Sequence, residues 1–131
     1  MLARNFMSAA DLGISAEHRA TLIALLGRFE RGKIKPEKFC MTSWCGTACC
    51  IWGQAKLISE TFIDLETIRH GGAPKQLHGL FLPSRSDDSL SVYPRGTDLA
   101  RITVEQAGRA LANYLTTGRS NWYNVLREEN V

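Results

Sequence analysis

Apolar residues recur at helical spacing along residues 16–31. Ser15 is a good N-cap for a helix in this stretch, and Gly32 is a good residue to end it. His18 falls one turn before Leu22 on the apolar face. That face is predicted to comprise Leu22, Leu25, Leu26 and Phe29. The opposite, polar side is predicted to carry Glu17, Thr21, Arg28 and Arg31.

A second amphipathic pattern begins near residue 103. Thr103 and Gln106 have the spacing of a capping box, and Gly118 is a good C-cap. The apolar face of this helix is predicted to comprise Val104, Ala107, Leu111, Tyr114 and Leu115. A last turn or two can start at Ser120 or Asn121 and would hold Trp122, Val125 and Leu126.

Residues 48–59 predict a third helix, with Thr47 as its cap. One side of this helix is apolar and comprises Ala48, Ile51, Trp52, Ala55 and Ile58. The opposite side is lined by Cys50, Gly53 and Leu57. A helix that is apolar on two sides is usually central in its bundle, so we expect this one to be the core helix.

Weaker patterns fill the middle of the chain. Residues 60–70 predict a short helix that ends at Gly71 and Gly72, and Pro74 suits the start of another with Leu77, Leu80 and Phe81. The polar residues 84–97 predict a surface loop, with a short extended piece at 90–93. Residues 1–14 and 128–131 are expected to be poorly ordered. Together these patterns predict a mostly α protein: a compact single-domain bundle of four to six helices over residues 1–131, with little or no sheet.

The composition agrees with one globular domain. The 131 residues are 44% hydrophobic and 22% charged, and a chain of this length buries about two-thirds of its unfolded surface on folding. No secretory signal opens the chain, and no apolar run approaches the roughly 18 residues that a membrane span needs. We therefore expect a cytoplasmic protein with no membrane partner, whose cysteines remain thiols.

The net charge of +3 comes from one short segment, residues 28–38. Its cations are Arg28, Arg31, Lys33, Lys35 and Lys38, against Glu30 and Glu37. These cations are candidate contacts for a phosphate or an acidic partner. The simpler interpretation, which we favour, is a solvated helix end whose positive charges complement the helix dipole. Nucleic acid is the less supported partner, because no aromatic side chains are interleaved with the cations to stack on bases.

All four cysteines lie within residues 40–50. A structural zinc site usually has two short-spaced ligand pairs, which are missing here, so we expect no metal and no cofactor. Cys49 and Cys50 would be the second and third residues of the predicted helix, where backbone N–H groups favour a thiolate. Cys45 and Cys49 could form a redox pair. The simplest interpretation is that the cysteines are small buried apolar residues.

The cysteine segment also carries a resemblance. Phe39-x-Met41 leads through Trp44 to the run Cys45-Gly46-Thr47-Ala48-Cys49-Cys50-Ile51-x-Gly53-x-Ala55, and Ile102-Thr103 opens a helix much later. This segment is similar to small bacterial and phage proteins that share an aromatic-x-Met, Cys-Gly-Thr-x-x-Cys and Gly-x-Ala pattern. The resemblance implies a bacterial or phage origin and a helical fold, and it implies no activity.

Two functional hypotheses follow from these features. The first is a small cytoplasmic, non-catalytic binding or regulatory module whose partner is a protein or, with less support, nucleic acid bound through residues 28–38. The second is a thiol-dependent enzyme or redox protein that uses Cys49 or Cys50, with Cys45 as the resolving partner. The catalytic candidates are therefore Cys45, Cys49 and Cys50.

Overall fold

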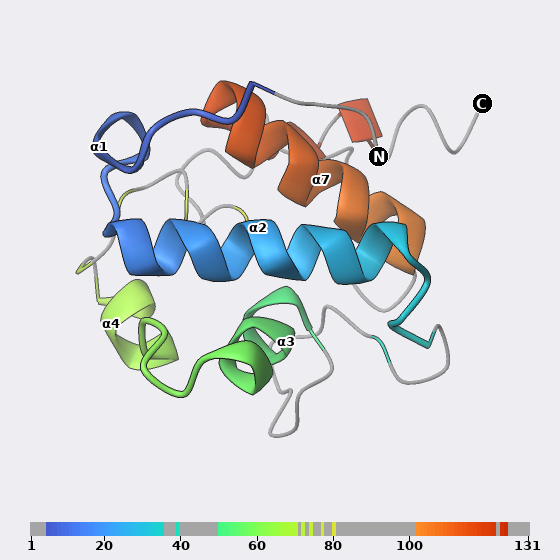
Figure 1. Ribbon diagram of the computed structural model, residues 1–131, viewed down its shortest axis with the longest axis horizontal. Helices are drawn as coiled ribbons and strands as arrows, with labels where there is room; N and C mark the ends of the chain where they lie inside the picture. The colour runs from blue at the N-terminus through green and yellow to red at the C-terminus, as the bar shows by residue number, and fades with distance from the viewer. Residues whose placement is uncertain are drawn as a thin grey trace.

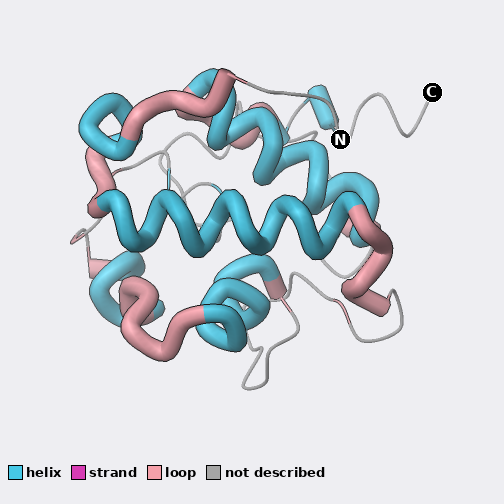
Figure 2. Tube along the Cα trace, viewed as in Figure 1, coloured by secondary structure: helices cyan, strands magenta, loops and turns pink. Residues whose placement is uncertain are grey.

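The protein is mostly helical. The computed structural model describes residues 5–35, 39, 50–70, 72, 74, 77, 80, 102–122, 124 and 125. Within them lie the helices α1 (Ala9–Leu12), α2 (Ala16–Glu30), α3 (Ile51–Ile58), α4 (Leu65–Arg69) and α7 (Val104–Thr117) (Figure 1). These described residues contain no strand (Figure 2). The predicted mostly α fold is therefore confirmed.

The helix at the centre of the described structure is α2. It packs against α7 on one side and against α3 on the other (Figure 1). All four apolar residues predicted for its buried face are buried there, and Leu22 and Leu25 are completely inaccessible to solvent. The prediction that residues 48–59 form the core helix is wrong, because α2 occupies the position between the other helices.

Both ends of α2 are capped as predicted. The Ser15 hydroxyl accepts a hydrogen bond from the backbone N–H of His18 at 3.0 Å. At the other end, Gly32 has a left-handed φ of 68°, and its N–H donates to the Phe29 carbonyl. The Lys33 N–H donates to the Arg28 carbonyl at 2.9 Å. These two bonds form a Schellman motif, which satisfies the last carbonyls of the helix.

Thr21 corrects one detail of the predicted polar side. It is buried, with 6% of its surface exposed, although the periodicity places it away from the core. Its hydroxyl donates to the Glu17 carbonyl one turn earlier, at 3.1 Å. This bond allows a small polar side chain to be buried at the edge of the helix interface.

The predicted capping box of α7 is present in full. The Thr103 hydroxyl accepts from the Gln106 N–H at 3.1 Å, and the Gln106 side chain accepts from the Thr103 N–H at 2.8 Å. Gly118 ends the helix with a φ of 85°. Each residue of the predicted apolar face is buried: Val104, Ala107, Leu111, Tyr114 and Leu115.

The third helix begins later than predicted. Residues 47–49 lie outside the described part of the chain, and α3 starts at Ile51 with Cys50 as its N-cap. Leu57, expected on a second apolar face, is 63% exposed. Trp52 is half-buried, and its indole Nε1 donates to the Ile63 carbonyl at 2.8 Å. Cys50 and Gly53, which were predicted on the same side as Leu57, are buried, so Leu57 is the exception.

Lys56 connects α3 to the segment that leads into α4. Its Nζ donates to the carbonyls of Glu60 and Phe62, at 2.9 and 3.0 Å, and to Asp64 Oδ1 at 3.0 Å. Three acceptors use all three protons of the ammonium group. The segment is thereby held so that Phe62 lies in the core, with 1% of its surface exposed.

Residues 5–14 are also tied to the core; residues 1–4, which belong to the segment expected to be poorly ordered, lie outside the described residues. The Met7 N–H donates to the Leu115 carbonyl at 2.8 Å, and Arg19 Nε donates to the Met7 carbonyl at 2.6 Å. Ser8 caps the short α1, and Leu12 is buried. These contacts join the segment to both α2 and α7.

Buried residues elsewhere complete the core. Leu77, Leu80 and Trp122 are inaccessible to solvent, and Trp122 Nε1 donates to the Leu80 carbonyl at 3.3 Å. The predicted loop at 84–97, the extended piece at 90–93 and residues 128–131 lie outside the described residues. Among the helices that are described, none has both the length and the apolar character needed to cross a membrane.

Candidate functional site

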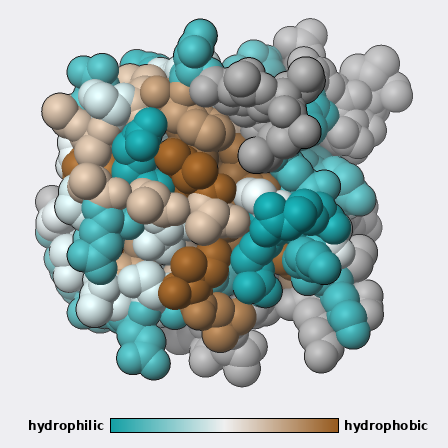
Figure 3. All heavy atoms as spheres, viewed as in Figure 1, coloured by the Kyte–Doolittle hydropathy of each residue, from teal (hydrophilic) through white to brown (hydrophobic). Residues whose placement is uncertain are grey.

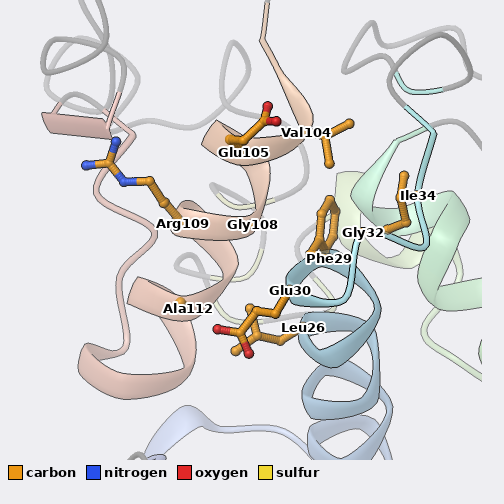
Figure 4. Close-up of a pocket in the computed structure, with 10 residues that line it drawn as sticks. All are labelled: Leu26, Phe29, Glu30, Gly32, Ile34, Val104, Glu105, Gly108, Arg109 and Ala112. Carbon is orange, nitrogen blue, oxygen red and sulfur yellow. The ribbon is translucent and has the colours of Figure 1, made fainter. Parts of the chain in front are cut away.

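A cleft of about 380 Å³ is lined by the C-terminal end of α2 and by α7, beside the point where the two helices meet (Figure 4). The turn after α2 contributes to one wall. The described residues that line the cleft are Leu26, Phe29, Glu30, Gly32, Ile34, Val104, Glu105, Gly108, Arg109 and Ala112. The cleft thus joins two parts of the chain that are far apart in sequence.

Large apolar side chains form the walls of the cleft, and small residues leave it open. Leu26, Phe29, Ile34 and Val104 are each at most 8% exposed, so core packing holds them in place. The Phe29 ring also makes an edge contact with the Phe39 ring, with centroids 5.9 Å apart. Gly108 and Ala112, on α7, add little volume. The apolar surface is therefore formed in advance of any binding event.

Three charged residues are also part of the lining. Glu30 extends from α2 toward α7, and Glu105 and Arg109 extend from α7 (Figure 4). Glu105 lies in the first turn of α7, where the helix dipole favours a carboxylate. On the face of the molecule that carries α2 and α7, apolar atoms are likewise gathered among hydrophilic ones (Figure 3).

The structure brings part of the basic segment to the edge of this cleft. Gly32 and Ile34 line the cleft, whereas the alternate residues Lys33 and Lys35 are exposed, as is Arg31. The sequence identified these three cations as binding candidates. Lys33 and Lys35 flank the lining residue Ile34 in sequence, whereas the Arg31 guanidinium lies beside Gly27, which does not line the cleft.

The two other predicted basic candidates contribute differently. Arg28 is half-buried, and its Nε is shielded from solvent with no hydrogen-bond partner among the described residues. Lys38 lies outside the described part of the chain.

Comparison with protein-family models, with curated proteins and with solved structures finds no match for this chain. The chemistry of the cleft and its surroundings is therefore the basis for a functional proposal.

The α7 wall of the cleft is the part that sequence reasoning missed. Val104 was expected only as a core residue, and Glu105 and Arg109 were not among the binding candidates. One signal was present in the sequence, since Gly108 lies inside an amphipathic helix where glycine is unfavourable. A glycine at such a position indicates the close approach of another element.

Cys50 is the described member of the three cysteine candidates, and it is not the third helical residue that the sequence predicted. It is the N-cap of α3, is 8% exposed, and its Sγ accepts from the Gly53 N–H at 3.4 Å. A buried thiol in a capping role fits a structural cysteine. Cys45 and Cys49 lie outside the described residues.

The described residues include side chains of the types that ligate metal ions. No group of three or more His, Cys, Asp or Glu side chains among them is arranged to hold a metal ion. The His18 ring makes an edge contact with Phe62, with centroids 5.2 Å apart. His70 follows α4 and contacts the Glu66 carboxylate at 3.2 Å on the exposed surface.

Tyr114 is the described group with a clearly shifted pKa. Its side chain on α7 is completely buried, and its hydroxyl has no hydrogen-bond partner among the described residues. Burial raises the pKa of Tyr114 from 10.0 to about 12, because the phenolate would have to exist away from water. Tyr114 does not line the cleft, so we assign this shift to the core.

Proposed function

We propose that the protein is a non-catalytic binding module whose cleft between α2 and α7 holds an apolar side chain of a protein partner. A single observation carries this proposal: buried apolar side chains border an open space of about 380 Å³. That volume is within the range of natural ligand pockets, about 300 to 1,000 Å³. Protein interfaces commonly place one apolar anchor in such a pocket and surround it with polar contacts.

The arrangement of charge supports a binding role. Glu30 and Glu105 are exposed and line the cleft beside its apolar walls, so they can orient a partner without being desolvated at the centre. A cytoplasmic setting, and a bacterial or phage origin, remain part of the proposal. They rest on the expected thiol state of the cysteines and on the resemblance of the Cys45–Ala55 pattern, quoted above, to small bacterial and phage proteins.

The test uses a small probe with an apolar ring, N-acetyltryptophanamide, titrated into isotope-labelled protein and followed by amide NMR shifts. Shifts are expected to concentrate at the end of α2 and the start of α7. Ala112→Phe, which places a ring in the cleft, should abolish them. Ala24→Phe is the matched control, because Ala24 is exposed on α2 and does not line the cleft.

Two results would overturn the proposal. One is a set of shifts located away from the cleft. The other is the persistence of cleft shifts in an Ala112→Phe variant whose circular dichroism and unfolding midpoint match those of the Ala24→Phe control. A loss of shifts in both variants would instead show a general change in the fold, and Ala112→Leu, which fills less of the cleft, would then be compared with Ala24→Leu.

A further inference from the structure

We propose that Met7 is a site of reversible oxidation by peroxides, and that its sulfoxide releases residues 5–14 from α2 and α7. This segment passes the C-terminal end of α7 before it reaches α1 and α2 (Figure 1). Its contacts with α7 lie at Leu115 and Gly118, beyond the residues of α7 that line the cleft. The proposal therefore does not depend on the binding function proposed above.

The backbone of Met7 attaches the segment to both central helices. The Met7 N–H donates to the Leu115 carbonyl on α7 at 2.8 Å, and the Met7 carbonyl accepts from Arg19 Nε on α2 at 2.6 Å. In the described part of the chain, the other hydrogen bonds of residues 5–14 stay within the segment and close its own turns. A change at Met7 therefore acts on both of the hydrogen bonds that hold this segment to α2 and α7.

The Met7 thioether lies against the residue that ends α7. A Cβ atom built on Gly118 would be 3.3 Å from Met7 Sδ and 3.4 Å from Met7 Cε. The missing side chain at position 118 thus leaves the space that the thioether occupies. Met7 also packs against the hydrophobic core, although part of the residue remains exposed. The site therefore fits a thioether closely while a molecule as small as hydrogen peroxide can approach it.

Oxidation would change both the size and the polarity of this group. The Sδ lone pair attacks one oxygen of hydrogen peroxide, the O–O bond breaks, and the other oxygen leaves as water. The sulfur is thereby oxidised by two electrons and the peroxide is reduced. The resulting sulfoxide is polar and is better solvated in water than against Gly118 and the core. Oxidation therefore favours the state in which the segment is released.

The rest of the segment is held by apolar contacts. Leu12 is 5% exposed, and Phe6 and Ile14 pack against the core. We therefore expect a local opening of residues 5–14 that uncovers apolar surface while α2 and α7 stay packed together. Methionine sulfoxide reductases restore the thioether, so the opening is reversible.

The test is hydrogen–deuterium exchange of the full chain before and after hydrogen peroxide, with dithiothreitol added afterwards to restore cysteine thiols. Mass spectrometry of the peptides locates the added oxygen. We expect an oxidised Met7, exchange at least about tenfold faster in peptides from residues 5–14, and unchanged exchange in α3. Met7→Leu, which is apolar and cannot form a sulfoxide, should keep slow exchange in the same peroxide. Met7→Gln, which is polar without oxidation, should exchange fast from the start.

Several results would overturn the proposal. They are resistance of Met7 to peroxide in the folded protein, a Met7 sulfoxide with unchanged exchange, and slow exchange in Met7→Gln. Peroxide-dependent opening of Met7→Leu equal to that of the wild type would also overturn it, because another methionine or a cysteine would then be responsible. If Met7→Leu already exchanges fast without peroxide, the oxidised wild type is treated with methionine sulfoxide reductase. Slow exchange that returns as Met7 loses its oxygen supports the proposal, and persistent fast exchange overturns it.

Discussion

Phe29 on α2 lies directly against Gly108 on α7: a Cβ atom built on Gly108 would be 3.3 Å from Phe29 Cβ. The nearest atom is attached to the α2 backbone, so it cannot rotate away as the end of a side chain can. The two helices approach closely at this point because residue 108 has no side chain. Since Phe29 and Gly108 also line the cleft, this contact contributes to both the core and the candidate site.

Replacing two helical glycines by alanine should therefore have opposite effects. Gly27→Ala on α2 should raise the free energy of unfolding by about 0.5 to 1 kcal/mol, because alanine favours the helix. Its new Cβ would meet only the guanidinium end of Arg31, at 2.9 Å, which can move. Gly108→Ala gains the same helical preference but must displace Phe29 or separate the helices, and we expect it to lower the free energy of unfolding. Urea denaturation measures both.

The contact between Phe29 and Gly108 would be contradicted if Gly108→Ala stabilised the protein as much as Gly27→Ala. Gly108→Val provides a stronger version of the same test. Its additional methyl groups should cost about 1 to 3 kcal/mol through overpacking.

Truncation of Leu111 should be costly, and truncation of Leu57 should not. Leu111 is completely buried on α7, so Leu111→Ala is expected to lower the free energy of unfolding by about 2 to 5 kcal/mol. Leu57 is 63% exposed on α3, so Leu57→Ala should change it by less than about 0.5 kcal/mol. Equal losses at both positions, measured by the same urea denaturation, would refute the orientation of α3.

Sequence patterns identified α2 and α7 because each helix carries its own boundary signals. Ser15 and Gly32 bound one helix, and the Thr103–Gln106 box begins the other, through bonds made within a few residues. Apolar residues recur at helical spacing over several turns of each helix, so the buried side of each could be predicted without knowing which elements pack against it. Local chemistry was sufficient for these elements.

The sequence misjudged α3 for the opposite reason. Thr47 is a better capping residue than cysteine, yet α3 begins after Cys50, and Leu57 is exposed although it is apolar. The burial of a short helix depends on which neighbours reach it, here α2 and the segment held by Lys56. A short sequence pattern contains no information about those distant contacts.

The candidate site was only partly predictable. Residues 28–38 were recognised as basic from composition alone. That Gly32 and Ile34 of this segment line the cleft depends on the turn that ends α2. The opposite wall comes from α7, so the cleft exists only once α2 and α7 are packed. Gly108 was the one sequence signal of that packing.

The reactivity of Cys50 should be low in the folded protein. Iodoacetamide is expected to label it at least about tenfold more slowly than in the denatured chain, because it is 8% exposed and caps α3. Cys50→Ala should cost about 1 kcal/mol through loss of the cap, and Cys50→Ser should cost less because a hydroxyl keeps that bond. Rapid native labelling, read by mass spectrometry, would revive the thiol-dependent hypothesis.

Tyr114 should make the protein less stable at high pH. Its pKa is raised to about 12 in the folded state, from 10.0 in the unfolded state, so the folded state binds the proton more tightly. The stabilisation is fully present below pH 10 and is lost as the pH rises toward 12. A shift of this size corresponds to a loss of about 2 kcal/mol in the free energy of unfolding by pH 12.

Tyr114→Phe isolates this contribution from the other groups that titrate at high pH. Near pH 7 the variant should be as stable as the wild type or slightly more stable, because the buried hydroxyl has no hydrogen bond to lose among the described residues. Between pH 10 and 12 the wild type should lose stability relative to the variant. Parallel pH dependences for the two proteins, or a large loss of stability in the variant at neutral pH, would mean that the hydroxyl is solvated or hydrogen-bonded in solution.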